Sequence, residues 1–65
     1  MTVEQIIILA RKNLGGDMES SARLCLEDAI NLRDAGKYDY AAKRAINSLA
    51  YSVGVFHPDY QRAVK

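Results

Sequence analysis

The stretch Gly36-Lys37-Tyr38-Asp39-Tyr40 (GKYDY, residues 36–40) lies between two long amphipathic segments and decides the fold. Glycine has no Cβ, so it accepts the positive φ at which many helices end. Asp39 is a residue type that favours the N-cap of a following helix. The stretch therefore predicts a loop of about two or three residues between antiparallel helices, because short connections place consecutive helices side by side.

Both segments that flank this turn show the spacing of amphipathic helices. In residues 17–35, for which Asp17 or Ser20 is the expected N-cap, apolar side chains recur at alternating steps of four and three residues. They are Met18, Ala22, Cys25, Ala29 and Leu32, with Leu26 and Ile30 beside them. Residues 39–56 combine an apolar ridge with a row of small residues, which let a neighbouring helix approach closely. The ridge is Ala42, Ile46, Leu49, Val53 and Phe56, and the small row is Ala41, Ala45, Ser48 and Ser52.

A further helix is expected over residues 2–14. Thr2 and Gln5 form a capping-box pattern at its start, and Gly15 is expected at the left-handed position after its end. Its core face is Val3, Ile6, Ile7, Ala10 and Leu14. Residues 58–64 are expected to form at most one short turn that begins at Pro58. The sequence thus predicts one all-α domain over residues 1–65, a three-helix bundle built on a long antiparallel hairpin.

Composition limits the classes of function. The chain has 65 residues, 49% of them hydrophobic and 26% charged, which is typical of a globular domain. A single cysteine, Cys25, and a single histidine, His57, provide neither an intrachain disulfide nor a zinc site. No secretory signal and no apolar run of the ~20 residues needed for a membrane span is evident. We therefore expect a cytoplasmic protein without a cofactor, a metal or a membrane partner.

The first helix carries more apolar residues than one core face requires. Ile8 and Leu9 point away from the Ile7 side, and Leu24 lies among polar residues of the second helix. Several such residues together indicate an additional buried surface. A homodimer explains this surface most economically, and another protein partner or a loosely packed surface would also fit. With the tyrosines, the candidate interaction surface is Ile8, Leu9, Leu24, Tyr40, Tyr51 and Tyr60.

The turn resembles two kinds of known helical hairpin. Gly36, Tyr38 and Ala41 are similar to the G-x-Y-x-x-A core of tetratricopeptide-type hairpins. That resemblance implies a glycine turn, an aromatic side chain that fills the closed end, and an alanine that allows close packing. With Arg44 and Ala45, the stretch also resembles small prokaryotic HEPN-like helical proteins. The ribonucleases among them carry a histidine soon after the arginine, a motif that is absent here, so this resemblance does not imply nuclease activity.

A third resemblance suggests DNA binding. Residues 35–47, AGKYDYAAKRAIN, align without gaps with the AG-x-S-x-x-T-V-S-R-V-x-N stretch of repressor helix-turn-helix proteins. This resemblance implies a DNA-binding regulator that uses residues 32–47. The residues placed to contact bases or phosphates are then Lys37, Tyr40, Lys43 and Arg44.

The chain shows no recognisable catalytic set. Cys25 lies on an apolar stripe, as a buried structural thiol would, and His57 precedes Pro58 as a turn or cap residue. No glycine-rich phosphate loop and no nucleophile–base pair is present. We therefore expect a non-enzymatic protein–protein interaction or regulatory protein that self-associates, with DNA binding as the alternative.

Overall fold

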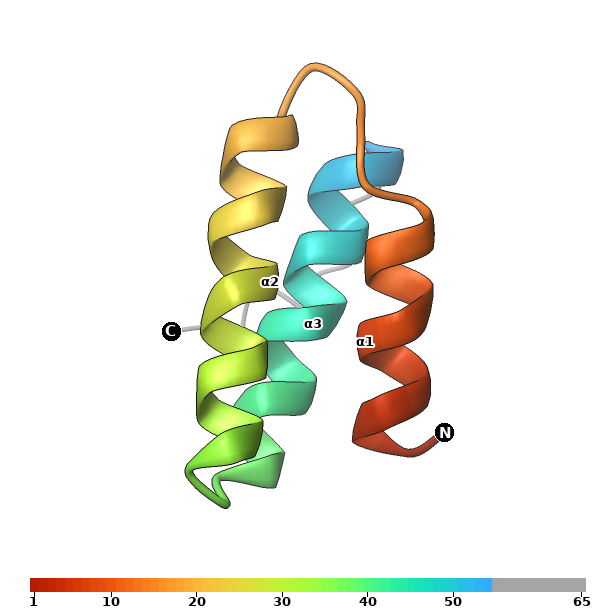
Figure 1. The fold of residues 1–65 in the computed structure, drawn as a ribbon. Coiled ribbons are helices and arrows are strands. Elements are labelled where there is room, and N and C mark those ends of the chain that lie inside the picture. The colour runs from red at the N-terminus through yellow and green to blue at the C-terminus, as the bar shows by residue number, and fades with distance from the viewer. Residues whose placement is uncertain (55–65) are drawn as a thin grey trace.

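The computed structural model describes residues 1–54, and these form three helices (Figure 1). They are α1 (Val3–Lys12), α2 (Glu19–Asp34) and α3 (Tyr38–Val53). Residues 1–54 contain no strand. The predicted all-α three-helix bundle is confirmed. Residues 58–64, with their expected short turn, lie outside the described residues.

The turn at Gly36 joins α2 and α3 as the sequence predicts. Gly36 has a φ of +78°, and its N–H donates to the carbonyl oxygen of Arg33 at 2.9 Å. The N–H of Lys37 donates to the carbonyl oxygen of Leu32 at 2.8 Å. These two bonds are the Schellman pattern, which satisfies carbonyls at a helix end. The chain reverses there, so α2 and α3 lie antiparallel and share the largest helix contact (Figure 1).

The capping box at the start of α1 is also confirmed. The Thr2 N–H donates to Gln5 Oε1 at 2.8 Å, and the Gln5 N–H donates to Thr2 Oγ1 at 3.2 Å. At the other end α1 stops at Lys12, because Asn13 is the C-cap and its Nδ2 donates to the carbonyl oxygen of Leu9 at 2.8 Å. The helix is therefore shorter than the predicted range 2–14.

Three other helix ends differ from prediction. The N-cap of α2 is Met18, without a side-chain cap, so neither Asp17 nor Ser20 caps this helix. The N-cap of α3 is Lys37, and Asp39 lies within the first turn, where its charge complements the helix dipole. At its C-terminal end α3 stops at Val53, because the next residue is a left-handed glycine. The described helix therefore ends before the predicted residue 56, and residues 55 and 56 lie outside the described residues.

The positive φ predicted for Gly15 belongs to Gly16 instead, at +80°. Gly16 also lies against the last turn of α3, where a Cβ on it would be only 2.9 Å from the carbonyl oxygen of Ser52. Gly36 has a similar φ, but a Cβ there would meet nothing within 4 Å. The α1–α2 loop therefore needs glycine for both its backbone conformation and its close approach to α3.

Substitution of these two glycines should separate the two effects. Gly16→Ala and Gly36→Ala should each lose about 1–2 kcal/mol because an L-residue is strained in the left-handed region. Gly16→Ala should lose more, because its contact is with backbone, which cannot move aside cheaply. Urea unfolding of both variants measures the difference. Equal losses would contradict the close approach of the loop to α3.

The core lies where the three helices meet, and much of it is made of small residues. Its buried members are Ile7, Ala10, Leu26, Ala29 and Ala45, with Val3, Ile6, Leu14, Ile30 and Leu49 packed around them. α1 packs more extensively on α3 than on α2. Ile7 on α1 and Leu26 on α2 are thus the large buried side chains of this cluster, and its other buried members are alanines.

The small row of α3, rather than its apolar ridge, faces α2. Ala41, Ala45 and Ser48 are fully buried, whereas Ala42, Ile46 and Leu49 are only half-buried and Val53 is exposed. The sequence predicted that this small row lets a neighbouring helix approach closely, and in the structure that helix is α2. The reason is that α2 presents small residues too, at Ala22 and Ala29, so the two backbones can approach closely.

Two buried polar side chains join α2 to α3. Ser48 Oγ donates to the carbonyl oxygen of Ala22 at 2.7 Å, and Asn47 Nδ2 donates to Cys25 Sγ at 3.1 Å. A buried polar group needs such a partner, because leaving it unpaired costs about 1–3 kcal/mol. The two bonds therefore favour one register of the hairpin over neighbouring registers.

Candidate interaction surface

The side of α1 that faces away from the core carries a shallow apolar hollow of about 380 Å³. It is lined by Met1, Gln5, Ile8, Leu9 and Lys12, which we call the outer face of α1. Ile8 is 59% exposed and Met1 is 79% exposed, whereas Leu9 is half-buried. Ile7, one residue before Ile8, is only 1% exposed. Successive helix residues differ by about 100° in direction, so α1 is apolar on two sides.

Sequence reasoning found part of this face and missed the rest. Ile8 and Leu9 were predicted as surplus apolar residues, but Met1, Gln5 and Lys12 were not assigned to the same surface. The signal was present, because residues 1, 5, 8 and 12 follow steps of four, three and four, the spacing of one helical row. Two of these positions hold polar side chains, which conceals the row in a search for apolar residues alone.

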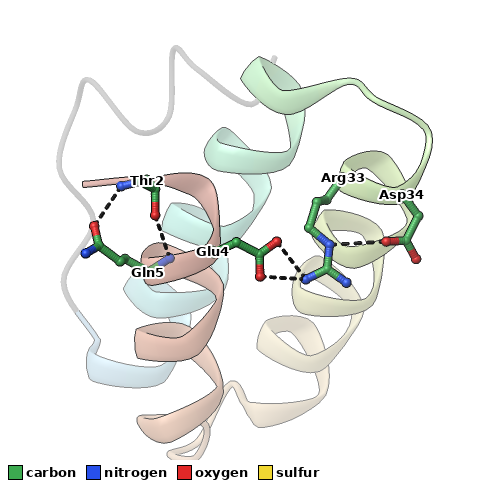
Figure 2. Close-up of polar contacts among 5 residues, drawn as sticks. All are labelled: Thr2, Glu4, Gln5, Arg33 and Asp34. Atoms are coloured by element: carbon green, nitrogen blue, oxygen red, sulfur yellow. Dashed lines mark hydrogen bonds and ion pairs between the residues drawn. The ribbon is translucent and has the colours of Figure 1, made fainter.

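One edge of the outer face is fixed against α2 by charged side chains (Figure 2). Arg33 Nη1 donates to both carboxylate oxygens of Glu4 at 3.1 Å, and Arg33 Nε donates to Asp34 Oδ1 at 3.1 Å. The bond to Asp34, and then the charge of Glu4, raise the pKa of the Arg33 guanidinium. The Glu4 side chain remains 61% exposed, so solvent screens the pair and its contribution to stability is small. Its main effect is to orient α1 on α2.

The structure does not gather the other predicted contact residues onto this face. Leu24 is 65% exposed, but it lies on α2. The exposed Arg23 precedes it, and exposed acidic residues follow it one turn later on the same helix. Tyr40 is exposed at the start of α3, and Tyr51 is half-buried near its end. Tyr60 lies outside the described residues. Of the predicted surface, only Ile8 and Leu9 adjoin.

The predicted nucleic-acid contacts lie at the start of α3. Lys37, Tyr40 and Lys43 are exposed, and Lys43 Nζ is 5.6 Å from the centroid of the Tyr40 ring. Arg44 is half-buried, with its Nε 3.8 Å from Asp28 Oδ2 on α2. Three of the four side chains can therefore reach a ligand, and the fourth is drawn toward α2.

The surface around Gly36 differs from the tetratricopeptide-type hairpin in one respect. Tyr38 is 59% exposed, so the expectation that it fills the closed end of the hairpin is wrong. Ala41, by contrast, is fully buried, as close packing of α2 and α3 requires. Residues 36–40 instead line an open hollow of about 330 Å³.

The antiparallel arrangement of α2 and α3 also bears on the helix-turn-helix resemblance. In helix-turn-helix proteins the two helices cross at about 90–120°, whereas here they run side by side (Figure 1). The start of α3 is exposed to solvent at Lys37, Tyr40 and Lys43. The crossing that would present α3 to a major groove is not the one this hairpin adopts.

Chemistry at the remaining polar groups is limited. No group of three or more His, Cys, Asp or Glu residues among residues 1–54 lies close enough to hold a metal ion. The Cys25 thiol is buried and accepts a hydrogen bond from Asn47, which suits a structural role. No helix within the described part of the chain is both long and apolar enough to cross a membrane.

The chain was compared with family models, curated proteins and solved structures, and none of these comparisons gives a match.

Proposed function

We propose that this chain is a non-enzymatic interaction protein that self-associates through the outer face of α1. The observation that carries the proposal is the exposed Ile8 beside Met1 and the half-buried Leu9. Full burial of one such side chain contributes about 1.5–3 kcal/mol, which matters in a small domain of marginal stability. We further propose that the protein works in the reducing cytoplasm. Cys25 is a buried thiol that forms no disulfide, which fits that compartment.

The size of the face predicts a weak association. α1 has 10 residues, so its length is about 15 Å. A contact limited to this helix is smaller than the ~1,200–2,000 Å² of a standard stable interface. We therefore expect a dimer whose population depends on protein concentration over the range that light scattering can cover.

Light scattering across a concentration series tests the proposal. The mass of the wild-type chain should rise from monomer toward dimer with concentration, and Ile8→Glu should remain monomeric at every concentration. Leu24→Glu is the matched control, because Leu24 is as exposed as Ile8 but lies on α2. It should behave as the wild type does. A wild-type chain that stays monomeric throughout, or a control that dissociates equally, would contradict the proposal.

A second candidate function is nucleic-acid binding by the start of α3, supported by the exposed Lys37, Tyr40 and Lys43. Neutralisation of about three phosphates would make the logarithm of the binding constant fall with the logarithm of salt concentration at a slope near −3. A gel-shift series between low and physiological salt measures that slope. Lys43→Glu should abolish the shift, and binding that does not respond to salt would contradict this candidate.

A further inference from the structure

We propose that the occupant of the outer face of α1 is the same face of a second copy, with the two α1 helices antiparallel about a two-fold axis near Ile8. This inference rests on the proposed function and specifies its partner and geometry. The evidence for this inference is the charged side chains along one edge of the outer face of α1. Glu4 and Arg11 are exposed and lie seven residues apart on α1, and seven residues are about two helical turns. Both therefore lie along the same edge of the helix.

The two-fold symmetry makes this edge complementary to itself. In an antiparallel pair related by a two-fold axis, each edge faces the same edge of the other helix, with the chain direction reversed. Glu4 then lies opposite Arg11 of the partner copy, and Arg11 opposite Glu4. Ile8 lies close to the midpoint between these two residues, so the two Ile8 side chains meet at the centre. Opposite charges at both ends and apolar contact between them set one register.

Other arrangements lose this complementarity. In a parallel two-fold pair, each edge faces the opposite edge of the partner helix. The opposite edge of this face carries Thr2, Leu9 and Asn13, which are uncharged. Glu4 and Arg11 would then have no charged partner on the second α1. The sequence of α1 thus favours an antiparallel copy of itself over a parallel one.

Glu4 keeps its contact with α2 in this arrangement. Its carboxylate accepts both hydrogen bonds from one nitrogen of Arg33, and a carboxylate has about four lone-pair sites. The Glu4 side chain is 61% exposed, so acceptor capacity remains accessible to Arg11 of the second copy. Arg33 holds the Glu4 side chain at the edge and so limits the conformational freedom lost when the copies associate.

Disulfide cross-linking tests the geometry. Under mild oxidation, Ile8→Cys should form a disulfide-linked dimer, because two facing residues near a two-fold axis fall within the Cα separation of about 4.4–6.8 Å that a disulfide needs. The wild-type chain should not cross-link, since its Cys25 is buried. Leu24→Cys, matched in exposure, should not cross-link either.

A pair of variants distinguishes antiparallel from parallel. Gln5→Cys and Lys12→Cys lie at opposite ends of the outer face. An antiparallel pair brings residue 5 near residue 12 of the other copy, so a mixture of the two variants should form the mixed disulfide and each variant alone should not. Cross-linking of each variant with itself, without mixed product, would overturn the antiparallel arrangement.

Reversing the charge of Arg11 tests the proposed ion pairs along this edge without introducing a cysteine. Arg11→Glu places like charges opposite Glu4 at both ends and should weaken the dimer at least about fivefold, since it replaces two attractive pairs with two repulsive ones. Lys43→Glu on α3 makes the same change in net charge and should leave the dimer unchanged. The double variant Glu4→Lys with Arg11→Glu restores opposite charges across the axis and should dimerise more strongly than Arg11→Glu alone, but less than the wild type because it loses the contact of Glu4 with Arg33. Circular dichroism confirms that each variant is folded.

The outcomes separate this inference from the function on which it rests. If the wild-type chain dimerises but Ile8→Cys does not cross-link and Arg11→Glu has no more effect than Lys43→Glu, the antiparallel geometry is wrong and self-association stands. If the wild-type chain is monomeric at every concentration, the proposed self-association itself is wrong. Cross-linking of Ile8→Cys, weaker dimerisation of Arg11→Glu and stronger dimerisation of the double variant would together support both the self-association and its antiparallel geometry.

Discussion

Replacing Ile7 by alanine is expected to remove about 2–5 kcal/mol from the free energy of unfolding, because the change deletes a fully buried side chain and leaves a cavity. A domain of 65 residues has a total stability of about 3–10 kcal/mol at 0.05–0.15 kcal/mol per residue. Ile7→Ala should therefore remove a large share of the free energy of unfolding. Urea titration monitored by circular dichroism measures the loss.

The adjacent residue provides the matched control. Ile8→Ala makes the same chemical change one position along α1, at a side chain that is 59% exposed. Its loss should stay within about 0.5 kcal/mol, as for surface substitutions in general, when measured at a concentration where the chain is monomeric. Comparable losses at the two positions would mean that α1 is rotated about its axis relative to the arrangement described.

The second large effect is expected from Ala45→Leu. Ala45 is fully buried on the small row of α3 and belongs to the core at which all three helices meet. A leucine there has no space unless α2 and α3 move apart, and overpacking of this kind costs about 1–3 kcal/mol or more. Ala42→Leu, at a half-buried position on the same helix, should cost less. A neutral Ala45→Leu would show that the α2–α3 interface is loosely packed.

The features of the fold that depend on local chemistry could be read from the sequence. Gly36 closes a Schellman turn because only the residue without a Cβ adopts its φ readily. Thr2 and Gln5 form their capping box because both partners lie within four residues of each other. In each case the residues that decide the structure are neighbours in the chain, so their pattern is sufficient.

Features set by contacts between helices could not be read in the same way. The small row of α3 predicts that some helix approaches closely, but which helix does so depends on the alanines that α2 presents, at Ala22 and Ala29. The positive φ of Gly16 rather than Gly15 depends on where the α1–α2 loop meets Ser52. Neither is encoded by the residues adjacent to it.

The same distinction between local pattern and helix packing applies to the candidate surface. The exposure of Ile8 and Leu24 followed from helical spacing, because each lies away from the buried residues of its own helix. Whether exposed residues of different helices share one surface depends on how the helices pack. That packing separates Leu24 on α2 and Tyr40 on α3 from Ile8 on α1, so among residues 1–54 the predicted contact residues that adjoin are Ile8 and Leu9.

The most direct test of the account measures the solvent accessibility of the Ile8 and Leu24 methyl groups by nuclear magnetic resonance with a paramagnetic co-solute. At low protein concentration both groups should be accessible, and at high concentration Ile8 should become protected while Leu24 stays accessible. Protection of Ile8 at every concentration would mean that its own chain covers it, and accessibility of Ile8 at the highest concentration would mean that no second copy does. Either result contradicts the account.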